Sequence, residues 1–356
     1  MIPVSIAPMM DWTDRHYRYF ARRLTRKALL YTEMITAAAI LFGDRDRLLG
    51  FHPEEHPISL QMGGDSPEQL ARAIELAEPR GYDEYNLNVG CPSDRVRTGN
   101  FGACLMADPP RVASLVRAMQ AVTDRPVTVK HRIGIDGLER YEDMLRFVDT
   151  LAAEGITRFT VHARIAILQG LSPRDNRTIP PLRYEEVYRL KRERPDLEIE
   201  INGGIKTLEE VREHRRHVDA VMIGRAAYAN PSMLAGIDGM IGAEGDLPGR
   251  TREEVVREMI PYLRDAVAAG SSPRAVFNPM LGLFAGRPGA RYWKRGLSGR
   301  LPEGLPPEEI LEAALSSVPA EIRGEPLPAV GSPPAANSPP AVRGITPEGV
   351  LRSRRT

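Results

Sequence analysis

Residues 85–92 read YNLNVGCP, and the interpretation of the whole chain starts from this stretch. The apolar residues Leu87 and Val89 alternate with polar ones, which is typical of a strand, and the Gly90-Cys91-Pro92 sequence predicts a tight turn at its end. In a parallel α/β barrel the chemistry lies at the carboxyl ends of the strands. Cys91 is therefore either a reactive thiol at an active-site mouth or a small buried apolar residue, as most free cysteines are.

Short apolar runs alternate with longer amphipathic stretches along most of the chain. The candidate strands are residues 4–10, 29–34, 58–63, 84–90, 127–132, 156–162, 198–202 and 220–224. Candidate helices follow at residues 67–78, 110–122, 141–154, 184–192, 208–214 and 231–239. This alternation over about 250 residues predicts a (β/α)8 TIM barrel. The rival, an open doubly wound sheet, needs a glycine-rich turn after its first strand, and residues 11–14 contain no glycine.

The pattern changes near residue 250. Residues 251–269, 273–284 and 306–315 have helical patterns and no strand-like run lies among them. We therefore expect a catalytic barrel over residues 1–245 and a small all-helical domain over residues 250–316. Residues 318–356 are rich in Pro, Ala, Gly and Ser and lack apolar periodicity, so we expect a disordered tail there.

Charge and composition restrict the class of protein. The net charge of +1 is not that of a general nucleic-acid binder, although basic residues and aromatic rings cluster within residues 287–300. No apolar run is long enough to span a bilayer and no signal segment is present, so we expect a cytoplasmic protein. Two cysteines without a CxxC spacing predict neither a disulfide framework nor a zinc site, and we expect no metal.

Candidate site residues occur at the ends of the predicted strands, so they should meet at one end of the barrel, its mouth. They are Pro8, Met9, Met10, Gln61, Asn88, Cys91, Lys130, Arg132, His162, Arg164, Asn202, Gly203, Gly204, Gly224 and Arg225. Each has an ordinary explanation alone, such as core packing or a solvated charge. A lysine inside a barrel strand, however, would be buried without a partner unless an anion occupied the mouth. The glycine turns after the last two strands are the usual phosphate site of this barrel. Because a lysine beside its ring stabilises a reduced flavin, we favour a flavin over a sugar phosphate.

Five separated blocks resemble the tRNA-dihydrouridine synthases. They are APMMDWTD at residues 7–14, NLNVGCPS at 86–93, GACLM at 102–106, VHAR at 161–164 and NGGI at 202–205. The match covers about residues 2–300, and the blocks at 172–182 and 289–294 are similar to the subfamily acting on tRNA positions 20 and 20a. The resemblance implies an FMN-bearing barrel, a helical domain that grips tRNA, NADPH as electron donor, and no obligate protein partner.

The resemblance also implies roles for individual residues. Pro8, Met9, Met10 and Gln61 would contact the flavin ring; Lys130 and His162 would contact its polar edge and phosphate end; and Asn202, Gly203, Gly204, Gly224 and Arg225 would hold its phosphate. The hydride would pass from the flavin to C6 of the uracil, and Cys91 would deliver a proton to C5. Asn88 would bind the flipped base, and Arg177, Pro180, Arg291 and Lys294 would contact the tRNA.

Two alternatives remain at this stage. Another FMN barrel could reduce or oxidise a free pyrimidine, which would need neither the basic cluster nor a helical domain. A non-catalytic RNA-binding protein could use a barrel scaffold without a flavin. Activity on free uracil would favour the first, and a colourless protein the second.

Overall fold

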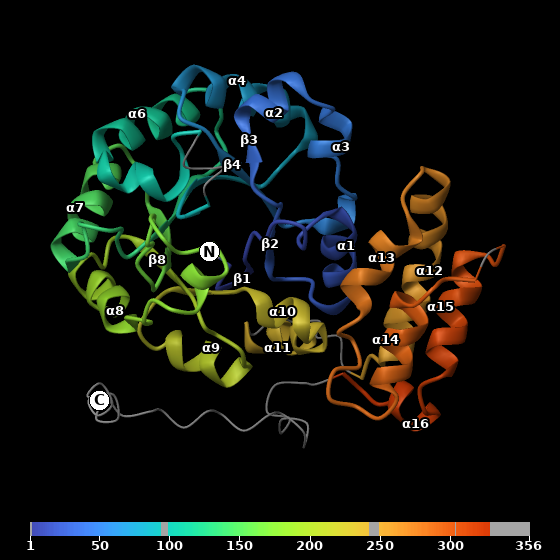
Figure 1. The fold of residues 1–356 in the computed structure, drawn as a ribbon. Helices are drawn as coiled ribbons and strands as arrows, with labels where there is room; N and C mark the ends of the chain where they lie inside the picture. Colours follow the sequence, from blue (N-terminus) through green and yellow to red (C-terminus); the bar gives the residue numbers. More distant parts are fainter. Residues whose placement is uncertain (1, 94–98, 242–248, 303, 328–356) are drawn as a thin grey trace, which may run out of the picture.

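The computed structural model describes residues 2–93, 99–241, 249–302 and 304–327. Figure 1 shows a ring of strands enclosed by helices, with a second group of helices on one side. Residues 242–245 of the expected barrel domain and residues 328–356 of the expected tail lie outside the described ranges.

Within these ranges nine strands form one sheet, in which all the pairings are parallel. The strands are β1 (Val4–Ile6), β2 (Leu29–Tyr31), β3 (Ile35–Thr36), β4 (Ile58–Gly63), β5 (Glu84–Val89), β6 (Val127–Arg132), β7 (Arg158–His162), β8 (Glu198–Asn202) and β9 (Ala220–Ile223). The barrel closes because β1 pairs with both β2 and β9, and β2 pairs with β4. The short β3 adds to β4 beyond the end of β2. The predicted (β/α)8 barrel is confirmed.

Helices surround the barrel and connect successive strands (Figure 1). They are α1 (Arg15–Leu24), α2 (Ala37–Phe42), α3 (Arg45–Leu49), α4 (Pro67–Ala77), α6 (Pro109–Gln120), α7 (Tyr141–Ala152), α8 (Tyr184–Glu193), α9 (Leu208–His214), α10 (Arg225–Ala229) and α11 (Ile237–Met240). Side-chain caps define several starts, as the sequence indicates. Ser66 caps α4, Asp108 caps α6, and Thr207 forms a capping box with Glu210 at α9.

Several predicted elements differ from the structure. The strand expected at residues 29–34 ends at Tyr31, and the helix expected at residues 273–284 ends at Met280. The first strand ends at Ile6 rather than at residue 10. Pro8 has no N–H to continue the ladder, so residues 7–10 form a loop at the strand end. The helix expected at residues 231–239 is a 3-10 helix (Pro231–Gly236) followed by α11.

The barrel interior has two unlike walls. Ala7, Leu29, Tyr31 and Met222, from β2, β9 and the segment after β1, form a small apolar cluster. The opposite wall, from β4 to β8, carries buried polar and charged side chains. These are Ser59, Gln61, Glu84, Asn86, Asn88, Thr128, Arg158, Thr160, Glu200 and Asn202, together with the half-buried Lys130. A polar wall of this size needs internal hydrogen bonds or a ligand to satisfy it.

The helices after residue 250 pack beside α1 (Figure 1). They are α12 (Arg252–Ala268), α13 (Pro273–Met280), α14 (Ala290–Ser298), α15 (Pro307–Ser316) and α16 (Ala320–Arg323). The start of the expected tail at residue 318 is a wrong prediction. Val318 and Leu327 are buried, and the Leu327 N–H donates to Arg250 O at 2.7 Å, which ties residues 318–327 to the helices. Across the described ranges, no helix has both the length and the apolar character for a membrane crossing.

Candidate active site at the barrel mouth

The register of the sheet brings the predicted site residues together. Asn88 on β5 is paired with Lys130 on β6. One step further along, Arg132 on β6 is paired with His162 on β7, which is paired with Asn202 on β8. The carboxyl ends of β5 to β8 therefore place these side chains at one end of the barrel, which we call the mouth.

A chain of side-chain amides fixes the turn that carries Cys91. Asn86 Nδ2 donates to Thr128 Oγ1, Gln61 Nε2 to Asn86 Oδ1, and Asn88 Nδ2 to Gln61 Oε1, each at 2.8 Å. Asn88 Oδ1 then accepts the Cys91 N–H at 2.9 Å. Asn88, expected to bind the base, thus also positions the thiol, which the sequence did not reveal.

Arg132 holds the same turn from another side. Its guanidinium donates to the carbonyls of Gly90 at 2.9 Å, Ile165 at 2.9 Å and Asn176 at 3.1 Å. Burial lowers the pKa of Arg132 to about 10, so the cation is held at a free-energy cost and stabilised by these carbonyls. The Cys91 turn is consequently tied to the loop that follows β7.

The Cys91 thiol itself is half-buried. Its Sγ donates to Ser93 Oγ at 3.4 Å. Among the described residues, no Lys or Arg side chain hydrogen-bonds to this sulfur. The second cysteine, Cys104, donates to Phe101 O at 3.1 Å.

Lys130 is half-buried in the polar wall, and its Nζ donates to Asn202 Oδ1 at 3.1 Å. Burial, reinforced by the Arg132 charge, lowers the pKa of Lys130 to about 8. The Asn202 amide is held in turn by its own donation to Met222 O at 2.9 Å. An ammonium has three donors, so the described contacts leave Lys130 able to bind an anion.

His162 lies in the most positive part of the mouth. Burial lowers the pKa of His162 well below its usual range, and the charges of Arg132, Lys130, Arg164 and Arg225 lower it further. The imidazole is therefore neutral at physiological pH and can donate or accept one hydrogen bond. This concentration of cations around a neutral ring favours an anionic ligand.

The two glycines after β8 have positive φ angles and close neighbours, so no other residue fits at these positions without strain. Gly203 has φ of 121°, and a Cβ there would lie 2.7 Å from His162 Cδ2. Gly204 has φ of 75°, and its Cβ would lie 2.6 Å from a Leu182 methyl group. At Gly224, before α10, a Cβ would meet only Ala7, at 3.8 Å, so this glycine leaves space at the mouth.

The expected tRNA contacts fall into two groups. Arg291 and Lys294 are exposed on α14, while Trp293 and Leu297 on the same helix are buried. Arg177 is exposed near the mouth, and its carbonyl accepts from Arg225 Nη2 at 3.3 Å. Pro180, in contrast, is buried, and its carbonyl accepts from Arg164. It offers RNA little surface, so its contribution is to the shape of the loop.

An ion network that was not predicted from the sequence lies below the mouth. Arg158 forms ion pairs with Glu84 at 3.2 Å and Glu200 at 3.3 Å. Ser5 and Thr160 also donate to Glu200, at 2.7 and 2.6 Å. Arg158, Glu84 and Glu200 satisfy one another in the part of the polar wall that lies away from the mouth. They come from three different strands, so the network forms only when the sheet is assembled.

Comparison with known proteins decides the family. A model of the dihydrouridine synthase family matches residues 5–315. This chain belongs to the dihydrouridine synthase family. A tRNA-dihydrouridine(20/20a) synthase from Synechocystis is 55% identical over 315 residues, covering 88% of this chain and 94% of the relative. Proteins of the same name from Shewanella oneidensis and Vibrio cholerae are 52% and 50% identical, covering 89% and 90% of this chain and 94% and 98% of the relatives. As a member of this family, the protein is a flavin-using oxidoreductase.

The mouth fits a flavin by the chemistry of its side chains. Lys130 supplies unused donors, His162 is a neutral imidazole beneath several cations, and Gly224 leaves open space. The ring of a flavin becomes anionic on reduction, and this charge matches the cationic side chains of the mouth. In the described ranges, no group of three or more His, Cys, Asp or Glu side chains could hold a metal ion.

Proposed function

We propose that this protein reduces the C5=C6 bond of uridines at positions 20 and 20a in the D-loop of tRNA to dihydrouridine, with FMN as cofactor and NADPH as electron donor. The substrate is supported by relatives that are at least 50% identical and are called tRNA-dihydrouridine(20/20a) synthases. These relatives match along 88% to 90% of this chain, including the helices after the barrel.

One observation carries the chemistry. Asn88, on the strand next to that of Lys130, accepts the backbone N–H of Cys91 and so holds the turn that carries the thiol. A proton donor and an anion-binding lysine at one mouth are the two groups that a reduction across a C=C bond needs from the protein. A thiol proton donor would be of no use to a protein that only binds RNA.

A bound FMN would supply the hydride that adds to C6 of the uracil. Cys91 then donates its thiol proton to C5 from the other face of the ring, so both atoms of the double bond become saturated. The amide chain from Thr128 to Asn88 keeps the thiol in place during this transfer. Fixed geometry of this kind contributes directly to the rate, since proton transfer needs the donor within hydrogen-bond reach.

Lys130 would stabilise negative charge on the cofactor ring, and His162 would donate or accept a hydrogen bond at the same edge. Gly203, Gly204, Gly224 and Arg225 would hold the phosphate, at the place where this barrel usually binds phosphate. Asn88 keeps one amide hydrogen beyond its contact with Gln61, and this hydrogen would contact the uracil.

The target base must leave the RNA stack to reach the mouth, because a stacked uracil hides C5 and C6. Arg177 near the mouth and the pair Arg291 and Lys294 on α14 would hold the phosphates on either side of the extruded nucleotide. The expected boundaries of the barrel and the helical domain, at residues 245 and 250, are part of this proposal.

The experiment is to purify the protein, identify the bound flavin, and assay an unmodified tRNA transcript with NADPH or NADH. We expect a yellow protein that contains FMN, prefers NADPH and forms dihydrouridine at positions 20 and 20a. Replacing each of the two uridines in turn assigns the sites. Reduction of free uridine at a comparable rate, or a protein without flavin, would contradict the proposal.

A further inference from the structure

Trp12 is an exposed indole at the rim of the mouth. It follows β1 directly, within the loop that carries Pro8 to Met10, and 37% of its surface is exposed. The chain has only two tryptophans, and the other, Trp293, is fully buried with its Nε1 donating to Met280 O at 3.0 Å. An indole that is partly in water can offer its free surface to a ligand.

The indole lies on a stack of tyrosine rings. Trp12 is stacked on Tyr228 of α10, with ring centroids 4.6 Å apart and an interplanar angle of 22°. Tyr228 is stacked in turn on Tyr17 of α1, at 5.3 Å and 23°, and Tyr17 is fully buried. Tyr228 is the ring that stacks on Trp12 among the described residues, so it covers one face of the indole.

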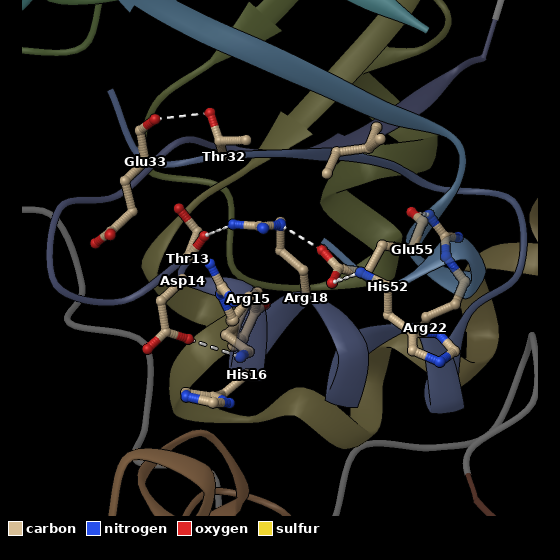
Figure 2. A network of polar contacts seen from close by, with 12 residues as sticks. Thr13, Asp14, Arg15, His16, Arg18, Arg22, Thr32, Glu33, His52 and Glu55 are labelled. Carbon is tan, nitrogen blue, oxygen red and sulfur yellow. Dashed lines mark hydrogen bonds and ion pairs between the residues drawn. The ribbon is translucent and has the colours of Figure 1, made fainter. Parts of the chain in front are cut away.

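The loop beneath Trp12 is held firmly. The N–H groups of Trp12 and Thr13 donate to Met9 O at 3.1 and 2.9 Å, and Met9 N donates to Thr13 Oγ1 at 2.9 Å. In Figure 2 the buried Arg18 lies between Thr13 and Glu55, where it donates to Thr13 O at 2.8 Å and to Glu55 Oε2 at 2.6 Å. The indole is therefore pre-organised, which lowers the entropy lost when a ligand stacks on it.

The position of Trp12 points to the path of the substrate. Tyr228 is three residues after Arg225, which begins α10 at the mouth, and α10 lies between the barrel and the helices after residue 250 (Figure 1). A Cβ at Gly282, between α13 and α14, would lie 2.9 Å from Tyr228 O, so the helical domain packs directly against this helix. RNA that reaches from the mouth to Arg291 and Lys294 would pass over the contact between α10 and the helical domain.

The charges around Trp12 favour a base over a phosphate. Asp11 and Asp14 belong to the same loop, and Glu33, which follows β2, has a half-buried carboxyl whose Oε1 has no hydrogen-bond partner among the described residues. Negative groups would repel the RNA backbone here. A neutral base has no such penalty, and stacking on an indole suits any of the four bases.

We propose that the indole of Trp12 is a stacking platform for a nucleobase of the bound tRNA, next to the uridine that enters the mouth. This inference rests on the proposed tRNA substrate. Trp12 acts as a positioning residue: it would hold the neighbouring nucleotide while the target base is extruded. Stacking would offset part of the free energy lost when the target leaves its own stack.

The first test uses tryptophan fluorescence of the flavin-loaded protein during titration with an unmodified tRNA transcript. We expect quenching that saturates with tRNA binding, because Trp12 is the exposed indole and Trp293 is buried. Trp12→Phe keeps an aromatic ring but removes this fluorophore, so it should bind tRNA without the quenching. NADP⁺ is titrated in parallel because its adenine could also stack. Quenching by NADP⁺ in place of tRNA would overturn the proposal.

The second test separates binding from folding. Trp12→Ala should weaken tRNA binding and raise its KM by about five- to one-hundred-fold, while Trp12→Phe should recover most of the loss. Phe42→Ala is the matched control, because Phe42 is 83% exposed on α2 and lies outside the site. Flavin content and thermal midpoint of each variant report on folding.

The outcomes distinguish the two proposals. If the wild type forms dihydrouridine but Trp12→Ala binds tRNA and turns it over like Phe42→Ala, the platform is refuted and the enzyme activity stands. If the wild type makes no dihydrouridine in tRNA, the proposed function itself is refuted.

Discussion

The protein has two groups of cations in very different surroundings. At the mouth, Lys130 is half-buried and Arg132 is buried, and desolvation lowers their pKa values to about 8 and about 10. On α14, Arg291 and Lys294 are exposed to water. A buried cation is expensive without an anion but interacts strongly with one, whereas an exposed cation interacts weakly and is screened by salt.

This difference indicates a division of work. The mouth is pre-arranged for one small anionic ligand in a defined position, with a thiol fixed beside it. The face of α14 is suited to a large polyanion that arrives by diffusion and is held by several weak contacts. Variants in the two regions should therefore differ in both the size and the salt dependence of their effects.

The largest effect is expected for Cys91→Ala. Loss of the proton donor should reduce dihydrouridine formation by about 10²- to 10⁴-fold. The variant should still contain flavin and still be reduced by NADPH, because Cys91 makes no described contact with Lys130 or the glycine turns. Mass spectrometry of the tRNA and the absorbance of the bound flavin measure the two properties. Cys104→Ala is the matched thiol control, with a much smaller effect, and loss of flavin from Cys91→Ala would contradict the assignment.

Gly203→Ala tests the other side of the mouth. The new methyl group would lie 2.7 Å from His162 Cδ2, at a φ of 121° that non-glycine residues rarely adopt. We expect flavin affinity to fall by at least about ten-fold. Flavin retained after dialysis measures this directly. Gly170→Ala also has positive φ but no atom within 4 Å of the new Cβ, so it controls for backbone strain alone. Equal flavin loss in both variants would show that backbone strain is responsible, and not the position of Gly203 at the mouth.

The pH dependence of flavin binding should report the protonation of Lys130. Its lowered pKa of about 8 means that the ligand-free protein loses this charge above pH 8, while an anion binds the charged form. Binding above pH 8 must therefore take up a proton, and affinity for FMN should fall by up to about ten-fold per pH unit. Titration of the apoprotein at a series of pH values checks this. Lys130→Met should bind more weakly and lack this pH-dependent step; a step that persists belongs to another group.

The smallest effects are expected on α14. Arg291→Ala or Lys294→Ala should weaken tRNA binding by about two- to five-fold. Each should also lower the slope of log affinity against log salt by about 0.7 to 0.9, if the residue contacts one phosphate. Arg216→Ala, an equally exposed cation at the end of α9, should change neither value. A weakened affinity with an unchanged salt slope would argue against phosphate contact.

Much of the fold was predictable because its signals are local. The alternation of apolar runs and amphipathic stretches predicts the barrel, and caps such as Ser66 and Thr207 mark helix starts. Prediction was less accurate where local and tertiary effects compete. The strand at residue 4 ends early at Pro8, and residues 318–327, although rich in tail-like residues, are held by the contacts of Val318 and Leu327.

The sequence by itself determined the barrel, the family and the members of the mouth, because strand periodicity and motif residues are properties of neighbouring positions. Only the tertiary structure decided what each member does to the others. Asn88 holds the Cys91 turn, Arg132 ties that turn to a second loop, and Trp12 lies on a tyrosine stack from two helices. The Arg132 and Trp12 contacts join residues far apart in the chain, so they form only when the strands and helices have packed together.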